Sequence, residues 1–388
     1  MKDQTNSPKP NWFDHTAGDL DEFANSIPAE TRAEDWPHAA DIQQHVLIYD
    51  GARIRAMHTK ERAALMGEWA RAFLQGPGIV VIKSAYPDLS VIDRATDLFS
   101  RTIEDQHKTG AGGGDHFAKP GANDRVWNAL QKHCLADPEG FALYYGNLCL
   151  SLVSTAWLGP HYQFTAQVNR VNPGGAAQSP HRDYHLGFMT REDAAQWPIH
   201  AHNLSPALTL QGAIAHCHMP IESGPTLYLP YSQRYSAGYI AFSRPEFQDY
   251  FAKNHAQLPL EKGDAAFFNP ALMHGAGTNI TTDTQRMANL LQVGSAFGRS
   301  IETVDRTAMI LALYPCLQST PFTPDEIDRI LAASTEGYAF PTNLDRDPPV
   351  GSMNPQSQKD ITKQALAQNM PLAEFTALMQ AWENRRRA

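Results

Sequence analysis

The sequence predicts a mainly β core of the jelly-roll, cupin-like type, with α-helices flanking it on both sides along the chain. Three observations point to this class. Short β-rich runs follow one another between residues 160 and 298, turn signals rich in Pro and Gly separate them, and helical periodicity occupies the segments before and after. Many short strands without helices between them are typical of a sandwich or barrel and not of a parallel α/β sheet.

The composition is that of a globular protein with a large core. Of 388 residues, 42% are hydrophobic and 19% charged, and the formal net charge is −9. An acidic balance argues against a nucleic-acid partner, because such binding needs a basic face. The four cysteines form no CxxC pair, which indicates free thiols in a reducing compartment. The N-terminal segment is polar and no run is long enough for a membrane span, so we expect a cytoplasmic protein without a membrane partner.

The chain divides into three regions that differ in composition and in hydrophobic periodicity. An N-terminal segment rich in Pro, Asp and Glu lacks periodicity, and we expect it to be irregular. The main domain follows, and a helical extension packed on it ends the chain. The expected boundaries are 1–45 for the irregular arm, 46–300 for the main domain with its helical front at 58–158 and jelly-roll core at 160–298, and 301–388 for the C-terminal extension.

The helical front contains three expected helices and one buried strand. Thr59 can cap the first helix, which Gly76 ends. The buried strand occupies 79–82, and the other helices are expected at 89–106 and 138–158. Between them, the glycine-rich run GAGGGDHF at 110–117 lacks the GKS or GKT ending of a phosphate loop and follows a helix, so we interpret it as a flexible, lid-like loop.

The core strands and the C-terminal helices follow. Strands are expected in QFTAQVNRV, ALTLQGAIAHC, TLYLP, DAAFFN and ANLLQVGSAF. Pro324 at a first helical turn, with Thr323 before it, begins a later helix. The last helix carries Leu372, Phe375, Met379 and Trp382 at helical spacing, and such apolar helices could dock a second copy of the chain in a homo-oligomer.

The first segment that carries chemistry is QSPHRD at 178–183. Its His181 and Asp183 are two residues apart on an extended segment, so their side chains point to the same side and can bind one ion together. A lone HxD pattern is weak evidence, because a chain with 16 histidines contains about one by chance.

The second segment, 261–286, supplies the rest of a site. Gly263 and Asp264 form a tight turn into a strand, His274 follows a Pro-containing loop, and Arg286 stands where the returning strand would begin. Two imidazoles and one carboxylate are the facial triad of non-haem iron(II), which leaves three positions open. A guanidinium nearby offers a planar fork for the far carboxylate of an oxo-diacid. Each residue alone is commonplace, whereas the ordered set is difficult to obtain by accident.

At this point the sequence resembles the phytanoyl-CoA dioxygenase family. The resemblance spans roughly 160–295, with a looser match at 76–86. Residues 222–226 resemble the acidic-x-Gly turn of the family. Residues 229–233 resemble its PGSH-like loop, although PYSQ here lacks the Gly and the His, which weakens the subfamily assignment more than the chemistry.

The resemblance implies a double-stranded β-helix in which His181, Asp183 and His274 bind iron(II) and Arg286 binds 2-oxoglutarate. It implies a dioxygenase that uses O2 to hydroxylate an aliphatic C–H bond of a small-molecule substrate and releases succinate and CO2. Halogenating relatives have a small residue where Asp183 stands, so this aspartate favours hydroxylation or a related oxidation. Acyl-CoA thioesters and free small molecules are both substrates in the family, and the lack of an obvious basic cluster for a CoA phosphate favours a free small molecule.

Five further residues are candidates for the site. Gln167 and Asn169 lie on the alternating strand before HxD, where they either donate to 2-oxoglutarate at the barrel mouth or face outward as ordinary polar residues. Tyr184, His185 and Phe188 follow the ligands directly and could line the substrate pocket.

Three alternatives remain open. The HxH pairs at 200–202 and 216–218 suggest a second metal, but structural histidines or a polar pocket explain them better. A cupin-like metal enzyme that does not use 2-oxoglutarate is one rival, against which Arg286 argues. A non-catalytic ligand-binding jelly roll is the other, and the complete ligand set argues against it.

Overall fold

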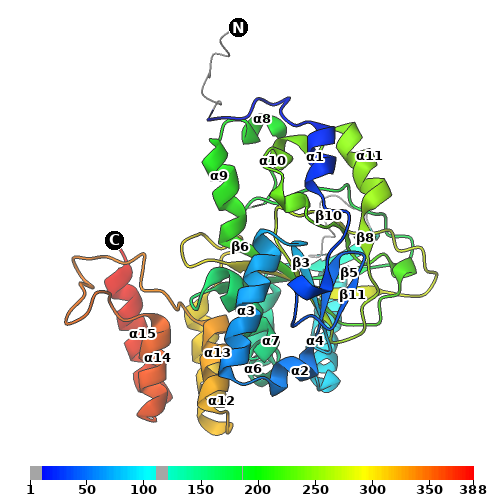
Figure 1. The fold of residues 1–388 in the computed structure, drawn as a ribbon. Coiled ribbons are helices and arrows are strands. Elements are labelled where there is room, and N and C mark those ends of the chain that lie inside the picture. Colours follow the sequence, from blue (N-terminus) through cyan, green and yellow to red (C-terminus); the bar gives the residue numbers. More distant parts are fainter. Residues whose placement is uncertain (1–10, 111–120, 186) are drawn as a thin grey trace, which may run out of the picture.

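The computed structural model describes residues 11–110, 121–185 and 187–388, and its centre is a pair of β-sheets (Figure 1). The larger sheet contains, in order across it, β1 (Asp41–Gln43), β2 (Val46–Asp50), β3 (Ile79–Lys83), β9 (Ala265–Phe268), β6 (Thr209–Ala215), β11 (Arg286–Gly294), β5 (Gln163–Val171) and β4 (Asn123–Val126). The smaller sheet contains β10 (Met273–Gly275), β7 (Leu227–Leu229) and β8 (Ala256–Gln257).

The pairing of these strands is that of a jelly-roll core. All named pairs are antiparallel except β2 with β3, which is parallel. The parallel pair arises because α2 and α3 connect the two strands, and such a crossover returns the chain in the same direction. An isolated bridge between His181 and His274 adds a fourth segment to the smaller sheet. The predicted mainly β, jelly-roll core is confirmed.

Side chains alternate along the strands of the larger sheet and give it two different faces. On β5, Phe164, Ala166 and Val168 pack into the main hydrophobic core, whereas Gln167 and Asn169 line a cavity on the opposite face. The same face of the neighbouring strands contributes Gln211, Ala213 and Ala215 from β6 and Arg286, Ala288, Leu290 and Gln292 from β11. The two-residue period of the strands therefore places polar side chains between the sheets.

Helices before and after the core strands pack against the other face of the larger sheet (Figure 1). They are α2 (Gly51–Ala56), α3 (Thr59–Leu74), α4 (Leu89–Thr109), α5 (Ala129–Ala136), α6 (Pro138–Tyr145), α7 (Leu148–Leu158), α12 (Arg306–Ser319), α13 (Pro324–Ser334), α14 (Gln358–Ala367) and α15 (Leu372–Arg386). A second group of helices contains α1 (Leu20–Ser26), α8 (Arg191–Ala194), α9 (Ile199–Leu204), α10 (Gly238–Ala241) and α11 (Pro245–Asn254). This group lies at the other end of the molecule, where α1, α10 and α11 pack with β7 and β10 of the smaller sheet (Figure 1). Short 3-10 turns lie at Ala33–Asp35, Ser205–Leu208, Ile221–Ser223 and Ser232–Arg234.

The front of the chain differs from expectation at three places. The segment before residue 46 is not wholly irregular, because it contains α1, a 3-10 turn and β1. His58, and not Thr59, caps α3 through a reciprocal capping box with Glu61. The single helix expected at 138–158 is two helices, since Asn147 breaks it and caps α7 by accepting from the amides of Cys149 and Leu150.

Two further findings concern the expected helices and loops. Among the described residues no single helix has the length and hydropathy to cross a membrane, and the α6–α7 pair that together meets both criteria bends by 60° at Asn147. The glycine-rich run at 110–117 lies outside the described residues except for Gly110, which ends α4 in a left-handed conformation with φ of 66°.

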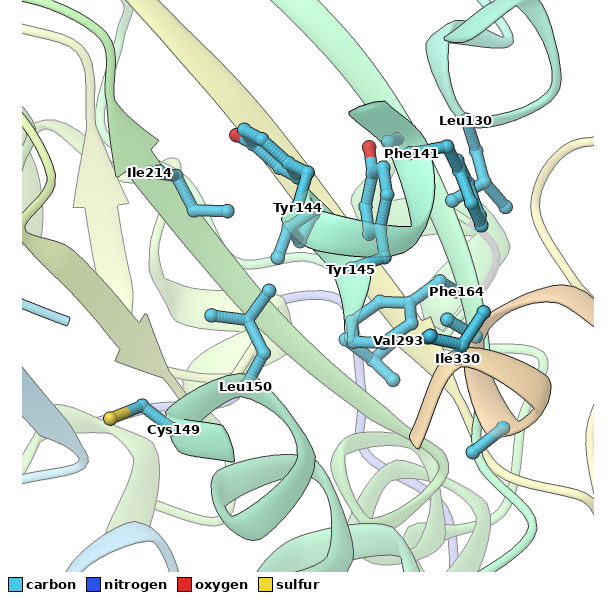
Figure 2. Packing of buried hydrophobic residues seen from close by; sticks show 14 of the residues in the cluster. Leu130, Phe141, Tyr144, Tyr145, Cys149, Leu150, Phe164, Ile214, Val293 and Ile330 are labelled. Carbon is cyan, nitrogen blue, oxygen red and sulfur yellow. The ribbon is translucent and has the colours of Figure 1, made fainter. Parts of the chain in front are cut away.

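The main core joins the helical front, the larger sheet and the C-terminal helices. Figure 2 shows Tyr144 and Tyr145 of α6 pointing toward the sheet, and their hydroxyls accept hydrogen bonds from Asn289 Nδ2 of β11 at 3.2 and 2.9 Å. Ile330 of α13 reaches the same core. Tyr314 of α12 stacks on Phe375 of α15, with the ring centroids 4.0 Å apart. The C-terminal helices therefore pack on the core as part of one hydrophobic cluster.

Candidate metal centre

Three side chains distant in sequence converge between the two sheets. The candidate ligand atoms of His181, Asp183 and His274 lie within 4.8 Å of one another, and within the described residues this is the one group of its kind. His181 Nε2 lies 3.8 Å from Asp183 Oδ1, and His274 Nε2 lies 3.8 Å from Asp183 Oδ2. This spacing leaves room for one ion between the three atoms.

Backbone pairing brings the two histidines together. The His181 amide donates to the His274 carbonyl at 2.8 Å, and the His274 amide donates back to the His181 carbonyl at 2.9 Å. Two residues on, the Asp183 amide donates to the Pro270 carbonyl at 2.9 Å. The HxD segment is therefore an extended neighbour of β10, and alternation turns both of its ligand side chains to one side.

Both histidines are held in the tautomer that suits a metal. His181 Nδ1 lies 2.8 Å from the Ser179 carbonyl, and His274 Nδ1 lies 2.8 Å from the Leu272 carbonyl. Because a carbonyl oxygen only accepts, each Nδ1 must carry the proton, which leaves each Nε2 lone pair directed at the ion site. Burial, followed by the neighbouring His181, lowers the pKa of His274 to about 4, so His274 is neutral at pH 7.

The aspartate completes the donor set. Its Oδ2 accepts a hydrogen bond from Gln211 Nε2, whereas its Oδ1 is buried and has no hydrogen-bond partner among the described residues. A buried carboxylate oxygen without a donor is costly unless a cation or a donor compensates it. Two imidazole nitrogens and this oxygen therefore fit the facial triad that binds ferrous iron and leaves positions open for other ligands.

A buried cation lies in the same cavity. Arg286 is the first residue of β11, and its Nη1 donates to the Ser223 carbonyl at 3.0 Å and to the Gly277 carbonyl at 3.4 Å. Burial lowers the pKa of Arg286 to about 10, which leaves it charged at neutral pH. Within the described part of the chain it forms no salt bridge. A buried guanidinium without a carboxylate is suited to hold an anionic ligand.

The turns expected in sequence set up this arrangement. Gly224 adopts φ of 72°, and a Cβ there would lie 2.4 Å from the Thr278 carbonyl, so the acidic-x-Gly turn needs its glycine to bring the Ser223 carbonyl to Arg286. At the start of β9, Gly263 adopts φ of 86°, and Asp264 accepts from the Ser84 amide at 2.8 Å. The Gly-Asp turn is therefore confirmed.

One cavity of about 380 Å³ contains the whole set. Gln167 and Asn169 lie on its wall, on the inward face of β5. Phe188 also lines it, with its ring centroid 5.2 Å from that of His181. The sequence did not single out other lining residues, among them Arg125, Trp127, Gln211, Thr226, Tyr228 and Gln292.

Two expected pocket residues lie elsewhere, and the prediction is corrected for them. Tyr184 stacks on Tyr239 with centroids 4.1 Å apart, and its hydroxyl lies 2.5 Å from His202 Nδ1. His185 Nδ1 lies 2.6 Å from Thr209 Oγ1. Because Asp183 points inward on extended backbone, Tyr184 points to the opposite side, and a tight turn then redirects the chain before Phe188.

The HxH pairs do not form a second metal group among the described residues. His202 bonds Tyr184, and buried His216 bonds Thr96 Oγ1 and the Tyr144 hydroxyl at 2.8 Å each. Exposed His218 pairs with a surface glutamate. These contacts agree with structural histidines, the alternative that the sequence favoured.

A family model gives the clearest match to known proteins. The model described as phytanoyl-CoA dioxygenase (PhyH) matches residues 59–288, which is more than half of the chain. The match includes all three candidate metal ligands and Arg286. No curated protein matches the sequence significantly.

Solved structures with similar folds include two enzymes of nogalamycin biosynthesis. The epimerase SnoN, described as non-haem and α-ketoglutarate-dependent, is 17% identical, and the alignment covers 60% of this chain and 84% of SnoN with a TM-score of 0.41. The carbocyclase SnoK, described in the same terms, is 18% identical over 62% of this chain and 85% of its own, with a TM-score of 0.43. With TM-scores below 0.5, these similarities are too distant to assign an activity.

Arg182, the residue between the two HxD ligands, connects both ligand segments. Its guanidinium donates to the Ser232 carbonyl and, at 3.1 Å, to the Tyr235 carbonyl. Ser232 Oγ in turn accepts from the Met273 amide at 2.8 Å, beside His274. The PYSQ loop therefore connects the HxD segment to β10.

We expect Arg182→Met to weaken both the fold and the metal site. The change removes the Arg182 donors from the Ser232 and Tyr235 carbonyls, which keep only the amides of Tyr235 and Gly238. The loss of these buried, charge-assisted hydrogen bonds costs about 2 kcal/mol in the free energy of unfolding, and it removes the link between the ligand segments. Urea denaturation and Co²⁺ titration measure the two effects. Arg244→Met is the matched control, because Arg244 also donates to backbone carbonyls, those of Thr16 and Gly18, but not to the PYSQ loop. A variant Arg182→Met with unchanged Co²⁺ affinity would contradict this role.

Proposed function

Because this chain belongs to the phytanoyl-CoA dioxygenase family, we propose that it is an iron(II)- and 2-oxoglutarate-dependent dioxygenase. It hydroxylates an aliphatic C–H bond of a small molecule and releases succinate and CO2. The observation that carries the proposal is the meeting of His181, Asp183 and His274 in the cavity that also contains the buried Arg286. The metal, 2-oxoglutarate and the substrate would thus bind in the same cavity.

Each ligand has a defined role in holding the iron. His181 and His274 would bind it through Nε2, and Asp183 through Oδ1. When bound with 2-oxoglutarate, the iron supplies the oxidising power of O2 toward a C–H bond. The chain orients both imidazoles through the Ser179 and Leu272 carbonyls, so that the donor set is preorganised before the metal arrives.

The cosubstrate is held by donors at several points. Arg286 takes the far carboxylate of 2-oxoglutarate, since its charge is buried and its fork suits a carboxylate. On β5, Gln167 Oε1 accepts from Arg125 Nη1 at 2.9 Å, which leaves the Gln167 amide nitrogen to donate to another oxygen. Asn169, two residues on and on the same face, is a second amide within the cavity.

The remaining wall favours a small substrate over an acyl-CoA. Phe188 and Trp127 supply aromatic surface. Among the described lining residues the charged ones are Asp183, Arg125 and Arg286, of which Asp183 and Arg286 are assigned to metal and cosubstrate. A CoA phosphate tail would need a cluster of cationic side chains. The rival without 2-oxoglutarate is disfavoured because it leaves the buried Arg286 without an anion.

We expect His181→Ala and Asp183→Ala each to abolish succinate formation, because two ligands hold the ferrous ion far less tightly than three. Anaerobic iron(II) with 2-oxoglutarate should give the unaltered protein a weak visible band near ~500 nm, of the order known for this class of site, and both variants should lack it. His218→Ala is the control, since that exposed histidine pairs with Glu261 and should retain both properties. Succinate formation by either ligand variant at the unaltered rate would reject the proposal.

We expect Arg286→Ala to raise the 2-oxoglutarate concentration needed for half-maximal succinate formation by about tenfold to a hundredfold, the loss expected for one charge-assisted carboxylate contact. Iron binding should persist, because Arg286 is not a ligand. Arg286→Lys should recover part of the affinity, since it retains the charge but not the fork. An unchanged 2-oxoglutarate requirement in Arg286→Ala would remove this residue from the cosubstrate site.

A further inference from the structure

Gln211 of β6 lies in the cavity wall beside the metal ligand Asp183. Its side chain is buried, with 6% exposure, and it lines the cavity. Its Nε2 donates to Asp183 Oδ2. The orientation of the amide is fixed by this contact, because the opposite orientation would face one acceptor oxygen with another. The Gln211 carbonyl oxygen must therefore point away from the aspartate.

The Gln211 oxygen has no donor in the protein. Oε1 is buried, and no hydrogen-bond partner lies within reach among the described residues. A buried carbonyl without a donor is destabilising, and such groups are kept where a ligand completes them. Gln211 is thus an acceptor at the wall of the cavity, adjacent to the ligand Asp183.

The expected cosubstrates do not satisfy this acceptor. At neutral pH, 2-oxoglutarate presents carboxylate and ketone oxygens, which only accept, and O2 donates nothing. Gln167 has the complementary polarity, since its Oε1 is occupied by Arg125 and its nitrogen is available to donate. The two glutamines therefore offer opposite groups to the cavity, Gln167 a donor and Gln211 an acceptor. Asn169 Oδ1 is a further buried acceptor of this wall without a partner among the described residues, but Gln211 is the one that also contacts the ligand Asp183.

We propose that Gln211 is a specificity-determining residue, which selects substrates that place an O–H or N–H donor beside the metal site. The proposal rests on the proposed function and narrows its substrate class to small alcohols, amines or amides. A site built to bond such a donor rejects analogues that lack it, because the buried acceptor is then left unpaired. Gln211 also positions Asp183, since its donation to Oδ2 leaves Oδ1 for the ion.

The proposed selection by Gln211 can be tested by comparing how tightly the intact protein binds small molecules with and without an O–H or N–H donor. The protein is loaded anaerobically with iron(II) and 2-oxoglutarate and titrated with pairs that differ in one donor, such as cyclohexanol with methoxycyclohexane and 2-piperidone with its N-methyl derivative. Shifts of the visible band and of the melting temperature report binding. We expect the donor-bearing members to bind about tenfold more tightly, the discrimination of roughly one buried hydrogen bond.

Variants assign that preference to Gln211. Gln211→Met, similar in size but without the amide, should lose the preference. Gln292→Met is the matched control, because Gln292 lies directly opposite Gln211 in the β11–β6 register and lines the same cavity. It should retain the preference.

Several results would overturn the assignment. The assignment would be wrong if both members of each pair bound equally, or if no donor-bearing member bound at all. It would also be wrong if the preference for donors survived in Gln211→Met, or if it disappeared equally in Gln292→Met. A changed Co²⁺ spectrum in Gln211→Met without a changed preference would show that Oε1 serves a metal-bound water instead. A different result would reject the proposed function itself, namely that the unaltered protein gives no visible band with iron(II) and 2-oxoglutarate.

Discussion

The reciprocal backbone hydrogen bonds between His181 and His274 are the constraint on which the rest of the site depends. They make the HxD segment a neighbour of β10 and fix how far apart the two imidazoles lie. The same extended backbone allows each ring to donate Nδ1 to the carbonyl two residues before it. One local backbone geometry, used twice, thus sets both the position and the tautomer of the histidine ligands.

The charges of the site are balanced only when ligands are included. Asp183 Oδ1 is a buried acceptor without a donor, and Arg286 is a buried cation without a carboxylate. Each would be costly in a protein that left it so. A divalent metal would complete the first and an anionic cosubstrate the second, which is why the arrangement of side chains already indicates the chemistry. Gln211 adds a further incomplete group, and its oxygen requires a donor.

Much of this could be predicted because the chemistry depends on short patterns. The HxD spacing fixes a shared side on any extended segment, and Arg286 was expected at the start of a strand, where it lies. Predictions were wrong where a local event interrupts a pattern. Asn147 breaks a long apolar helix, and the turn that begins at Tyr184 directs His185 away from the cavity. Tyr184 was wrongly assigned for another reason, because alternation turns it to the side opposite Asp183.

Other residues of the site could not be found from sequence, for a different physical reason. Gln211 is the one amide side chain of β6, and only the tertiary fold shows that Asp183 is its partner. Arg125 lies on the short edge strand β4, and its contact with Gln167 joins strands that are distant in sequence. Such contacts depend on which strands pair, and α5, α6 and α7 separate β4 from β5 along the chain.

Anomalous diffraction from crystals grown with Mn²⁺ in place of iron, and with 2-oxoglutarate, tests the central claim most directly. The account predicts one metal peak, at about 2.0–2.3 Å from Nε2 of both histidines and from Asp183 Oδ1, as is usual for such ligands. It also predicts that the far carboxylate of 2-oxoglutarate lies on Arg286. A metal bound away from either histidine, or a 2-oxoglutarate carboxylate held by another cation, would contradict it.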